Sequence, residues 1–501
     1  MNYSMMMGAG FALVQLLSLN SCGDVDSDLD GWTVSDGDCN DMDSSVHPEA
    51  IDICDDGIDS NCDRVGCEPR GVISLAQADA SLTGEEANTW AGIAIAGAGD
   101  VNHDGWGDVI IGALFGSEFR GNAYVVYGPV EGPLSLSAAD GRMTGEMIDD
   151  DAGISVARAG DLNGDGYGDV LVGSTEYPQG AGNGAAYVVY GPVSGEYPLG
   201  EAEGRISGAL PLDSVGISVA SLSRGPGKSR QVVVSARGDD TGGEDLGAIL
   251  LYNTVETDET SADADIRLTG EVAGAGTGFP IAAGGDFNGD GVEDLLVAAP
   301  GAAGGPLQGK TYVIYGPVTT SMSLADADAI LVAEEAGDLA SRGLASAGDV
   351  NADGYDDVLV GAPKQGAGGV AYLLYGPLEG TISLAEADVR LTAESVNDLA
   401  GLSVSSAGDF NRDGYGDILV GAMYGADFKG VTYLFYGPVA GNRSLEEADA
   451  TFVGEVAGDF SSETLALAGD LNQDGYPEIL IGAPGHLGYT GVTYVIQGHG
   501  Y

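Results

Sequence analysis

The stretch Asp161–Asp169, DLNGDGYGD, decides the fold because variants of it recur along the chain. Oxygen-bearing side chains stand at its first, third, fifth and ninth positions, and the sixth is Gly166, which tolerates the positive φ of a sharp turn. Alternating oxygens on a tight loop, with the backbone carbonyl of the seventh residue, predict a cage for a hard cation, best suited to Ca²⁺. The expected ligands in this copy are Asp161, Asn163, Asp165, Tyr167 (through its carbonyl) and Asp169.

Five more copies begin at positions 100, 286, 349, 409 and 470, spaced about 60 to 63 residues apart except for one gap of about twice that length. The gap contains a degenerate copy, residues 216–236, that keeps the sequence of both flanking strands but lacks the acidic loop. We therefore expect seven units and about six Ca²⁺ ions. The expected ligands in the five copies are Asp100, Asn102, Asp104, Trp106 and Asp108; Asp286, Asn288, Asp290, Val292 and Asp294; Asp349, Asn351, Asp353, Tyr355 and Asp357; Asp409, Asn411, Asp413, Tyr415 and Asp417; and Asp470, Asn472, Asp474, Tyr476 and Glu478.

Each unit is predicted to form four strands joined by short turns. In one unit these are residues 142–146, 154–160, 169–174 and 185–192, and a period this long without helical patterning indicates an all-β, seven-bladed β-propeller with four-stranded blades. The strand before the cation loop is rich in Gly, Ala and Ser, which fits crowding at the axis, and Tyr187 and Tyr190 should pack between blades.

The phase of the repeat predicts how the ring closes. The chain enters with an outer strand near residues 81–85 and leaves on a third strand, 493–498, so pairing of the two would complete the seventh blade and remove exposed edges. Before each outer strand, motifs such as SLAE (383–386) and SLEE (444–447) predict a capping box on one helical turn.

The composition restricts the class of partner. Eighteen Lys and Arg residues stand against 77 Asp and Glu, for a formal charge of −59. A nucleic acid partner is excluded because no basic surface is available to release its counterions, and direct binding to an anionic membrane is equally disfavoured. We expect a monomer whose only membrane contact is a lipid anchor.

The first 22 residues predict export. They contain a short apolar run, FALVQLLSL, too short for a transmembrane helix, and end in LNSC. The ending resembles a bacterial lipobox, which implies lipidation at Cys22 and an outer-membrane or cell-surface lipoprotein. Plain secretion and an uncleaved anchor remain alternatives.

Residues 23–70 form a separate acidic segment with too few apolar residues for a core. The run DVDSDLDG suggests a further cation turn at Asp26, Asp28 and Asp30, and four cysteines suggest two disulfides with three possible pairings among Cys39, Cys54, Cys62 and Cys67. The segment resembles the MopE-type metal-binding motif of bacterial surface proteins, which allows copper as well as calcium. The alternative is a disordered acidic spacer.

Residues 71–501 resemble seven FG-GAP repeats of the kind found in the N-terminal β-propeller of integrin α subunits. The likeness rests on the acidic loops, on Gly-Ala-Pro at 361–363 and 482–484, and on the seven-fold count. It implies structural Ca²⁺ and a cell-adhesion or ligand-binding role. The chain departs from the pattern where Ala152 replaces the signature Phe, where the third unit lacks its loop and where Glu478 replaces Asp.

The variable loops after the second strand are the expected recognition sites: 114–122, 174–184, 236–247, 363–369 and 423–430. The ligand would be an extracellular protein or, as in a lectin, a glycan. A passive structural or metal-binding surface protein is the second alternative. An enzyme is the least favoured class, because the sequence contains no HExxH, nucleophile elbow or Walker loop, and we expect no catalytic residues.

Overall fold

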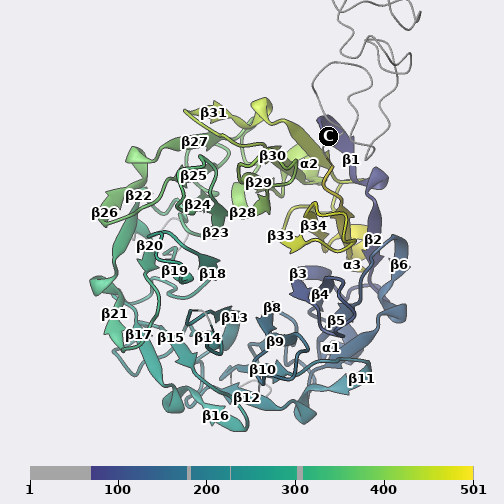
Figure 1. Cartoon of the computed structure of the whole chain (residues 1–501), viewed down its shortest axis with the longest axis vertical. Helices are drawn as coiled ribbons and strands as arrows, with labels where there is room; N and C mark the ends of the chain where they lie inside the picture. The colour runs from purple at the N-terminus through teal and green to yellow at the C-terminus, as the bar shows by residue number, and fades with distance from the viewer. Residues whose placement is uncertain (1–68, 178–181, 226, 302–307, 500–501) are drawn as a thin grey trace, which may run out of the picture. The chain divides into compact units, whose positions relative to one another are not determined.

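The computed structural model describes residues 69–177, 182–225, 227–301 and 308–499, which belong to one compact unit, Glu68–Gly500. Seven sheets stand around a central axis as the blades of a propeller (Figure 1). The all-β class and the seven-fold count are therefore confirmed. The predictions for Cys22, for the acidic turn at residues 26–30 and for the four other cysteines lie outside the described residues.

Each sheet contains five strands, which we describe from the axis outward, numbering the sheets one to seven. The innermost strands are β3 (Ala91–Gly99), β8 (Ser155–Gly160), β13 (Val215–Leu222), β18 (Ile281–Gly285), β23 (Gly343–Gly348), β28 (Ala400–Gly408) and β33 (Thr464–Gly469). The second are β4 (Asp108–Ala113), β9 (Asp169–Ser174), β14 (Gln231–Ala236), β19 (Asp294–Ala299), β24 (Asp357–Ala362), β29 (Asp417–Ala422) and β34 (Glu478–Ala483). The third are β5 (Asn122–Val126), β10 (Ala185–Val189), β15 (Ala248–Tyr252), β20 (Gln308–Ile314), β25 (Val370–Leu374), β30 (Val431–Phe435) and β35 (Val492–Ile496).

The outer part of each sheet combines two units. The fourth strands are β7 (Gly141–Thr144), β12 (Gly204–Ser207), β17 (Ile266–Thr269), β22 (Ala329–Ala336), β27 (Val389–Thr392), β32 (Ala450–Val453) and β2 (Ala80–Thr83). The fifth, supplied by the next unit along the chain or by a terminus, are β11 (Gly195–Pro198), β16 (Asp258–Thr260), β21 (Met322–Ser323), β26 (Gly380–Ser383), β31 (Arg443–Ser444), β1 (Gly71–Ser74) and β6 (Gly132–Ser135).

The fifth strand is an addition to the predicted four. It is short and pairs in parallel with the fourth strand, as β11 does with β7 from Gly195 opposite Gly141 to Pro198 opposite Thr144. The physical reason is the open edge: an unpaired fourth strand would expose its N–H and C=O groups, and the extended segment before each turn covers them.

The predicted closure of the ring is confirmed, and a second pairing of an N-terminal strand accompanies it. The strand β2 pairs antiparallel with β35, from Ala80 opposite Val495 to Thr83 opposite Val492. In addition, β1 pairs in parallel with β32 of sheet six. The N-terminal end of the propeller therefore supplies β1 to sheet six and β2 to sheet seven, whose three inner strands come from the C-terminal end (Figure 1).

The helical turns before the fourth strands are single 3₁₀ turns: η2 (Leu75–Gln77), η3 (Leu136–Ala138), η4 (Leu199–Glu201), η5 (Ser261–Asp263), η6 (Leu324–Asp326), η7 (Leu384–Glu386) and η8 (Leu445–Glu447). At Ser383 and Ser444 the hydroxyl accepts the N–H two residues on, so the serine cap is present. A complete capping box occurs instead at Thr260 and Asp263.

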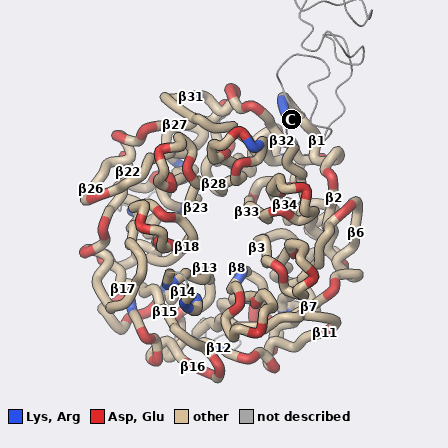
Figure 2. The backbone as a smooth tube through the Cα atoms, viewed as in Figure 1, with Lys and Arg blue, Asp and Glu red and all other residues tan. Residues whose placement is uncertain are grey.

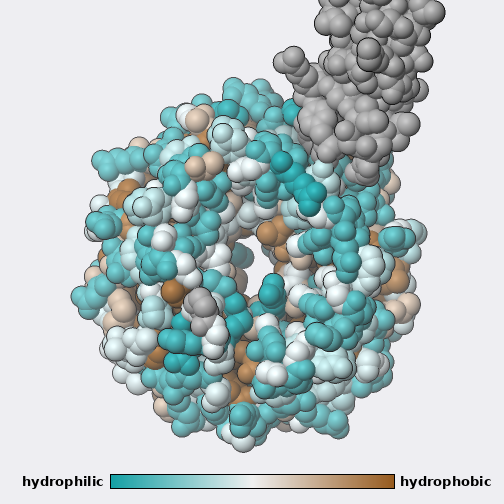
Figure 3. Space-filling model, in the orientation of Figure 1, coloured by the Kyte–Doolittle hydropathy of each residue, from teal (hydrophilic) through white to brown (hydrophobic). Residues whose placement is uncertain are grey.

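The surface of the propeller is acidic all round, with Asp and Glu on every sheet and few Lys or Arg (Figure 2). The space-filling view shows the ring open at its centre (Figure 3). There the small residues of the inner strands alternate with aliphatic ones, and one aliphatic side chain from each sheet, Ile95 on β3 through Leu465 on β33, lines an axial cavity. The expectation that the axis leaves no room for large side chains thus holds for only part of each strand.

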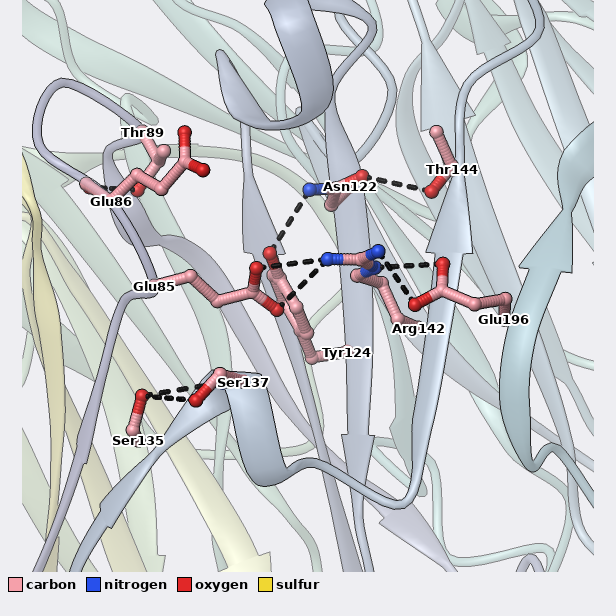
Figure 4. A network of polar contacts seen from close by, with 10 residues as sticks. All are labelled: Glu85, Glu86, Thr89, Asn122, Tyr124, Ser135, Ser137, Arg142, Thr144 and Glu196. Carbon is pink, nitrogen blue, oxygen red and sulfur yellow. Dashed lines mark hydrogen bonds and ion pairs between the residues drawn. The ribbon is translucent and has the colours of Figure 1, made fainter.

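Neighbouring sheets share their cores. They are also joined by a hydrogen bond from a tyrosine of the third strand to a glutamate that follows the fourth strand of the preceding sheet, which we call the latch. The tyrosine of the third strand is fully buried, and in sheet two the hydroxyl of Tyr187 donates to Glu146 Oε1 (3.1 Å), which follows the fourth strand of sheet one. Arg205 Nη1 donates to the same oxygen at 2.8 Å. In sheet one, Arg142 lies between Glu85 and Glu196 and bonds both (Figure 4).

The latch recurs at four other junctions, whereas at the junction of sheets seven and one the Tyr124 hydroxyl accepts a hydrogen bond from Asn122 Nδ2 at 3.0 Å. Other tyrosine–glutamate pairs are Tyr312 with Glu271, Tyr372 with Glu334, Tyr433 with Glu394, and Tyr494 with Glu455. At the junction of sheets two and three both partners are replaced, by Leu250 and Ala209. The unit that lost its acidic loop therefore lost its latch as well.

Candidate metal sites and recognition face

All six acidic loops adopt the same backbone turn between the first and second strands of their sheets. In the loop of Asp161, that carboxylate accepts the N–H groups of Asp165 and Gly166, each at 3.0 Å. Asn163 Oδ1 accepts the N–H of Asp165 at 2.9 Å, and its Nδ2 donates to Asp165 Oδ2 at 2.8 Å. Gly166 has φ +94°, as its predicted role requires. The loop thus forms the tight turn that its spacing implies, while the role of its side chains as cation ligands stays a prediction.

The ninth residue of each loop is a fully buried carboxylate at the start of the second strand. In the loop of sheet two, Asp169 accepts the N–H of Leu162 at 2.7 Å and that of Gly191 at 3.0 Å. Burial is the main cause of the raised pKa of all six carboxylates. Hydrogen bonds from backbone N–H groups lower the pKa, and the other carboxylates of the loop raise it further. The pKa is raised to about 6 for Asp108 and Asp169, about 7 for Asp294 and Asp357, and about 8 for Asp417 and Glu478.

Two carboxylate oxygens of the loops are buried without a hydrogen-bonding partner in the described ranges: Oδ1 of Asp409, a first residue, and Oε1 of Glu478, a ninth residue. Among the described residues the longer Glu478 accepts one backbone N–H, that of Leu471, whereas Asp417 in the preceding loop accepts two. A buried carboxylate oxygen without a donor is costly, and a cation offsets that cost. The donor set of each loop, which consists entirely of oxygen, fits calcium.

The loop side chains are held by hydrogen bonds within the loop. No group of three or more His, Cys, Asp or Glu side chains in the described part of the chain is gathered in a metal-binding arrangement. In every loop the Asn Nδ2 donates to the carboxylate two residues later, at 2.7 to 3.2 Å. Such Asx-type bonds hold the same atoms that would ligate a cation, so the ligand roles stay predictions.

In sheet three a salt bridge stands at the place of the missing loop. Arg230 donates to both oxygens of Glu293, at 2.9 and 2.7 Å, and Glu293 lies in the acidic loop of sheet four. Ser223 N–H also reaches Glu293, at 2.9 Å. The unit without the acidic loop therefore supplies a guanidinium to its neighbour. The sequence showed the loss of the loop but not this partner.

On the opposite end of the strands, seven aromatic side chains form a continuous row across sheets six, seven and one. Successive ring centroids are 5.2 to 6.4 Å apart, and Trp90 and Tyr489 are stacked at 15°. We call this row the aromatic arc: Phe428, Tyr424, Phe460, Tyr489, Trp90, Phe115 and Phe119.

Three matching turns present the arc. They are α1 (Gly116–Phe119), α2 (Gly425–Phe428) and α3 (His486–Tyr489), and each contains left-handed residues, such as Ser117 at φ 49° and ψ 58°. Left-handed backbone costs an L-residue roughly 1–2 kcal/mol, and strain of this kind concentrates at binding sites. The aromatic residue that ends each turn is exposed: Phe119 57%, Phe428 54% and Tyr489 38%.

Two predicted recognition loops, 114–122 and 423–430, carry α1 and α2, so sequence reasoning found two of the three turns. It missed α3, although an aromatic residue precedes x-Gly in all three, as in Phe119-Arg-Gly and Tyr489-Thr-Gly. The loops at 174–184, 236–247 and 363–369 lie outside the arc, and residues 178–181 of the first are not described.

A cavity of about 580 Å³ opens beside the end of the arc. Tyr424 and Phe428 line it together with Asp398 and Asp427, and the exposed Val396 lies on the same wall. Aromatic faces next to carboxylate acceptors can hold a ligand that presents both apolar C–H groups and hydrogen-bond donors.

Comparison with known proteins agrees with this architecture. Five segments match the FG-GAP repeat: residues 152–189, 280–314, 343–374, 400–435 and 463–496. Each falls in a different sheet and includes an acidic loop. Residues 38–66 match the Cu-binding MopE model, a metal-binding motif.

Curated relatives are integrin α subunits. The chain is 34% identical to integrin alpha-PS2 of Drosophila melanogaster over 221 residues, 29% to integrin alpha pat-2 of Caenorhabditis elegans over 225, and 36% to human integrin alpha-IIb over 149. These alignments cover 40%, 40% and 27% of this chain, but only 14%, 17% and 14% of the relatives. Within the described residues, we find no helix with the length and apolarity needed to span a bilayer.

Proposed function

We propose, from the premise that this chain carries the FG-GAP repeats of an integrin α-like propeller, that it is an exported, calcium-binding adhesion or ligand-binding module. Calcium acts structurally. The six acidic loops hold it through their carboxylates, the Asn amide oxygen and the carbonyl of the seventh residue. The ion neutralises three carboxylates that would otherwise repel one another, and it fixes the turn between the first two strands.

The aromatic arc is the observation that carries the recognition role. Exposed aromatic rings contribute large contact area at low entropic cost, and here they cross three sheets on strained turns. The partner is an extracellular protein or glycan. The alternative of a lectin-like glycan binder is favoured by the cavity beside Tyr424, where ring faces and two carboxylates adjoin.

Export and anchoring follow from the first 22 residues: we propose a lipoprotein acylated at Cys22 and held at a bacterial outer membrane or cell surface, or a secreted form. The acidic segment at residues 23–70 would bind further metal, through Asp26, Asp28 and Asp30, with its four cysteines in two disulfides. We propose no enzymatic activity.

A triple substitution tests the recognition role. Phe119→Ala, Phe428→Ala and Tyr489→Ala together remove the exposed rings of the arc. The full chain, with Ca²⁺, would be screened on panels of purified extracellular proteins and glycans. Binding to a ligand that the wild type retains should weaken at least tenfold, because exposed aromatic anchors dominate such interfaces.

The control is Val72→Ala, an even more exposed apolar side chain on the edge strand β1. It should leave binding unchanged. Retention of the ligand by the folded triple variant would place recognition elsewhere. The absence of any wild-type ligand, with calcium binding intact, would favour the passive structural protein.

A further inference from the structure

The axial cavity has a volume of about 330 Å³ and receives side chains from all seven innermost strands. Its middle level is aliphatic throughout, from Ile95 on β3 to Leu465 on β33. Figure 3 shows it open to solvent at the centre of the ring. The volume lies at the lower end of the range for ligand pockets, so a ligand here is a small molecule with an apolar part.

Two charged residues stand one level nearer the mouth. Arg342 immediately precedes β23 and Glu463 immediately precedes β33, and both line the cavity together with Leu344 and Leu465, two positions further on. They come from sheets five and seven. Each is close enough to the other for its charge to influence the other's pKa.

Within the described ranges, no salt bridge or side-chain hydrogen bond holds the Arg342 guanidinium or the Glu463 carboxylate, although each feels the charge of the other and Arg342 lies over the ring of Phe279. Burial lowers the pKa of Arg342 and raises that of Glu463, although each charge partly offsets the effect on the other. Both residues keep part of their surface exposed to the cavity, so each charge is accessible to a ligand group of opposite charge.

The guanidinium is already oriented. Its Cζ lies 4.5 Å from the centroid of Phe279, and Arg237 approaches the same ring at 5.8 Å. Stacking occupies the planar face of a guanidinium and leaves its in-plane N–H donors available for a carboxylate.

We propose that the axial cavity binds a free α-amino acid with an aliphatic side chain, its carboxylate on Arg342, its ammonium on Glu463 and its side chain in the aliphatic level. A fatty acid would leave Glu463 unpaired, and an alkyl amine would leave Arg342 unpaired. The site goes beyond the proposed recognition role, because it uses neither the aromatic arc nor the calcium loops.

Titration calorimetry on the full chain with L-leucine tests the proposal, with two analogues that each lack one charge, 4-methylpentanoate and 3-methylbutan-1-amine. L-Leucine should bind one to one, and each analogue at least about tenfold more weakly, because hydrogen bonds to charged groups are worth that much. No binding of L-leucine up to about 10 mM, or equal binding of 4-methylpentanoate, overturns the proposal.

Variants then assign the two ends. Arg342→Gln and Glu463→Gln should each weaken L-leucine about 10- to 100-fold, and Arg342→Gln should bring leucine and the amine to similar affinities. Arg443→Gln, the same change on the outer strand β31, is the matched control and should have no effect. Unchanged affinity in folded Arg342→Gln refutes the assignment. The analogue series on the wild type decides the matter if a variant fails to fold.

Discussion

At the scale of residues, His486 and Asp459 form a nearly buried pair beside the aromatic arc. His486 Nδ1 lies 3.1 Å from Asp459 Oδ1, and the side chains are 11% and 1% exposed. The hydrogen bond to Asp459 raises the pKa of His486 above its ordinary value, against the effect of burial, and Glu455 adds to the rise. The protonated histidine therefore stabilises the fold.

The sign of this linkage gives a pH prediction. Because the folded-state pKa is raised, the stabilisation is fully present below the unfolded pKa of about 6.5 and is lost as pH rises through the folded value. His486→Gln, which keeps a donor but cannot titrate, should lower the free energy of unfolding by about 1 kcal/mol at pH 5.5 and by less at pH 8.5. Urea unfolding at both pH values measures it. A loss that grows with pH would contradict the linkage.

The sequence predicted individual positions well where chemistry is local. The loop at Asp161 contains its own hydrogen-bonding partners within six residues, so spacing alone placed them. The partner of Arg230 lies in another sheet, and the oxygen of Glu478 lacks the donor that the glycine after the third strand supplies in the other loops, as Gly437 does for Asp417; no local pattern encodes either. The same holds for Arg342, whose significance appears only when seven inner strands meet.

At the scale of elements, the latch shows how one sheet is joined to the next. Glu146 ends a fourth strand and accepts hydrogen bonds from Tyr187 and Arg205 of the following sheet. A buried hydroxyl bound to a carboxylate is worth roughly 1.5–3 kcal/mol. The latch therefore contributes to the alignment of adjacent sheets beyond the apolar packing they share.

A double-mutant cycle tests the latch. Tyr187→Phe should reduce the free energy of unfolding by about 1 to 2 kcal/mol, and Glu146→Gln combined with it should cost less than the sum of the two single changes. Tyr190→Phe is the control, since the Tyr190 hydroxyl only meets the Val255 carbonyl at 3.4 Å and should cost less. Additive costs in the cycle would mean that the two side chains act independently.

Element boundaries show where prediction from sequence ended. Four strands per unit were visible because each is an apolar or small-residue run. The fifth was not: β21 and β31 have two residues each and no apolar pattern. Such strands exist because a neighbouring edge is open, which is a property of the assembled sheet. The turn α3 occupies the same place between the second and third strands as α1 and α2, but its residues 486–489 were not among the predicted loops.

At the scale of the whole molecule, calcium should act on the ring as a unit. Extracellular calcium modules bind at roughly 10⁻⁴ to 10⁻³ M, so at about 1 mM each site contributes roughly 0.4 to 1.4 kcal/mol. Six sites sum to several kcal/mol. For a propeller of this size the melting temperature should then fall by about 3 to 9 °C on chelation.

Native mass spectrometry and thermal melting check this prediction on the full chain. We expect six ions in the propeller, with any further ions assigned to the acidic N-terminal segment through a variant with Asp26, Asp28 and Asp30 changed to Asn. Asp169→Asn should lower the count by one. If the propeller bound zero or one ion and its melting temperature did not change on chelation, the acidic loops would be hydrogen-bonded turns without a metal.

The double closure of the ring also determines when the protein can finish folding. The antiparallel partner of β2 is β35 and the partner of β1 is β32, so the ring closes through pairing between segments that lie far apart in the sequence. Such long-range pairing forms slowly, and the edges of β32 and β35 stay open until it occurs. A variant without β35 would leave sheet seven without its third strand and β2 without its antiparallel partner, so the ring could not close.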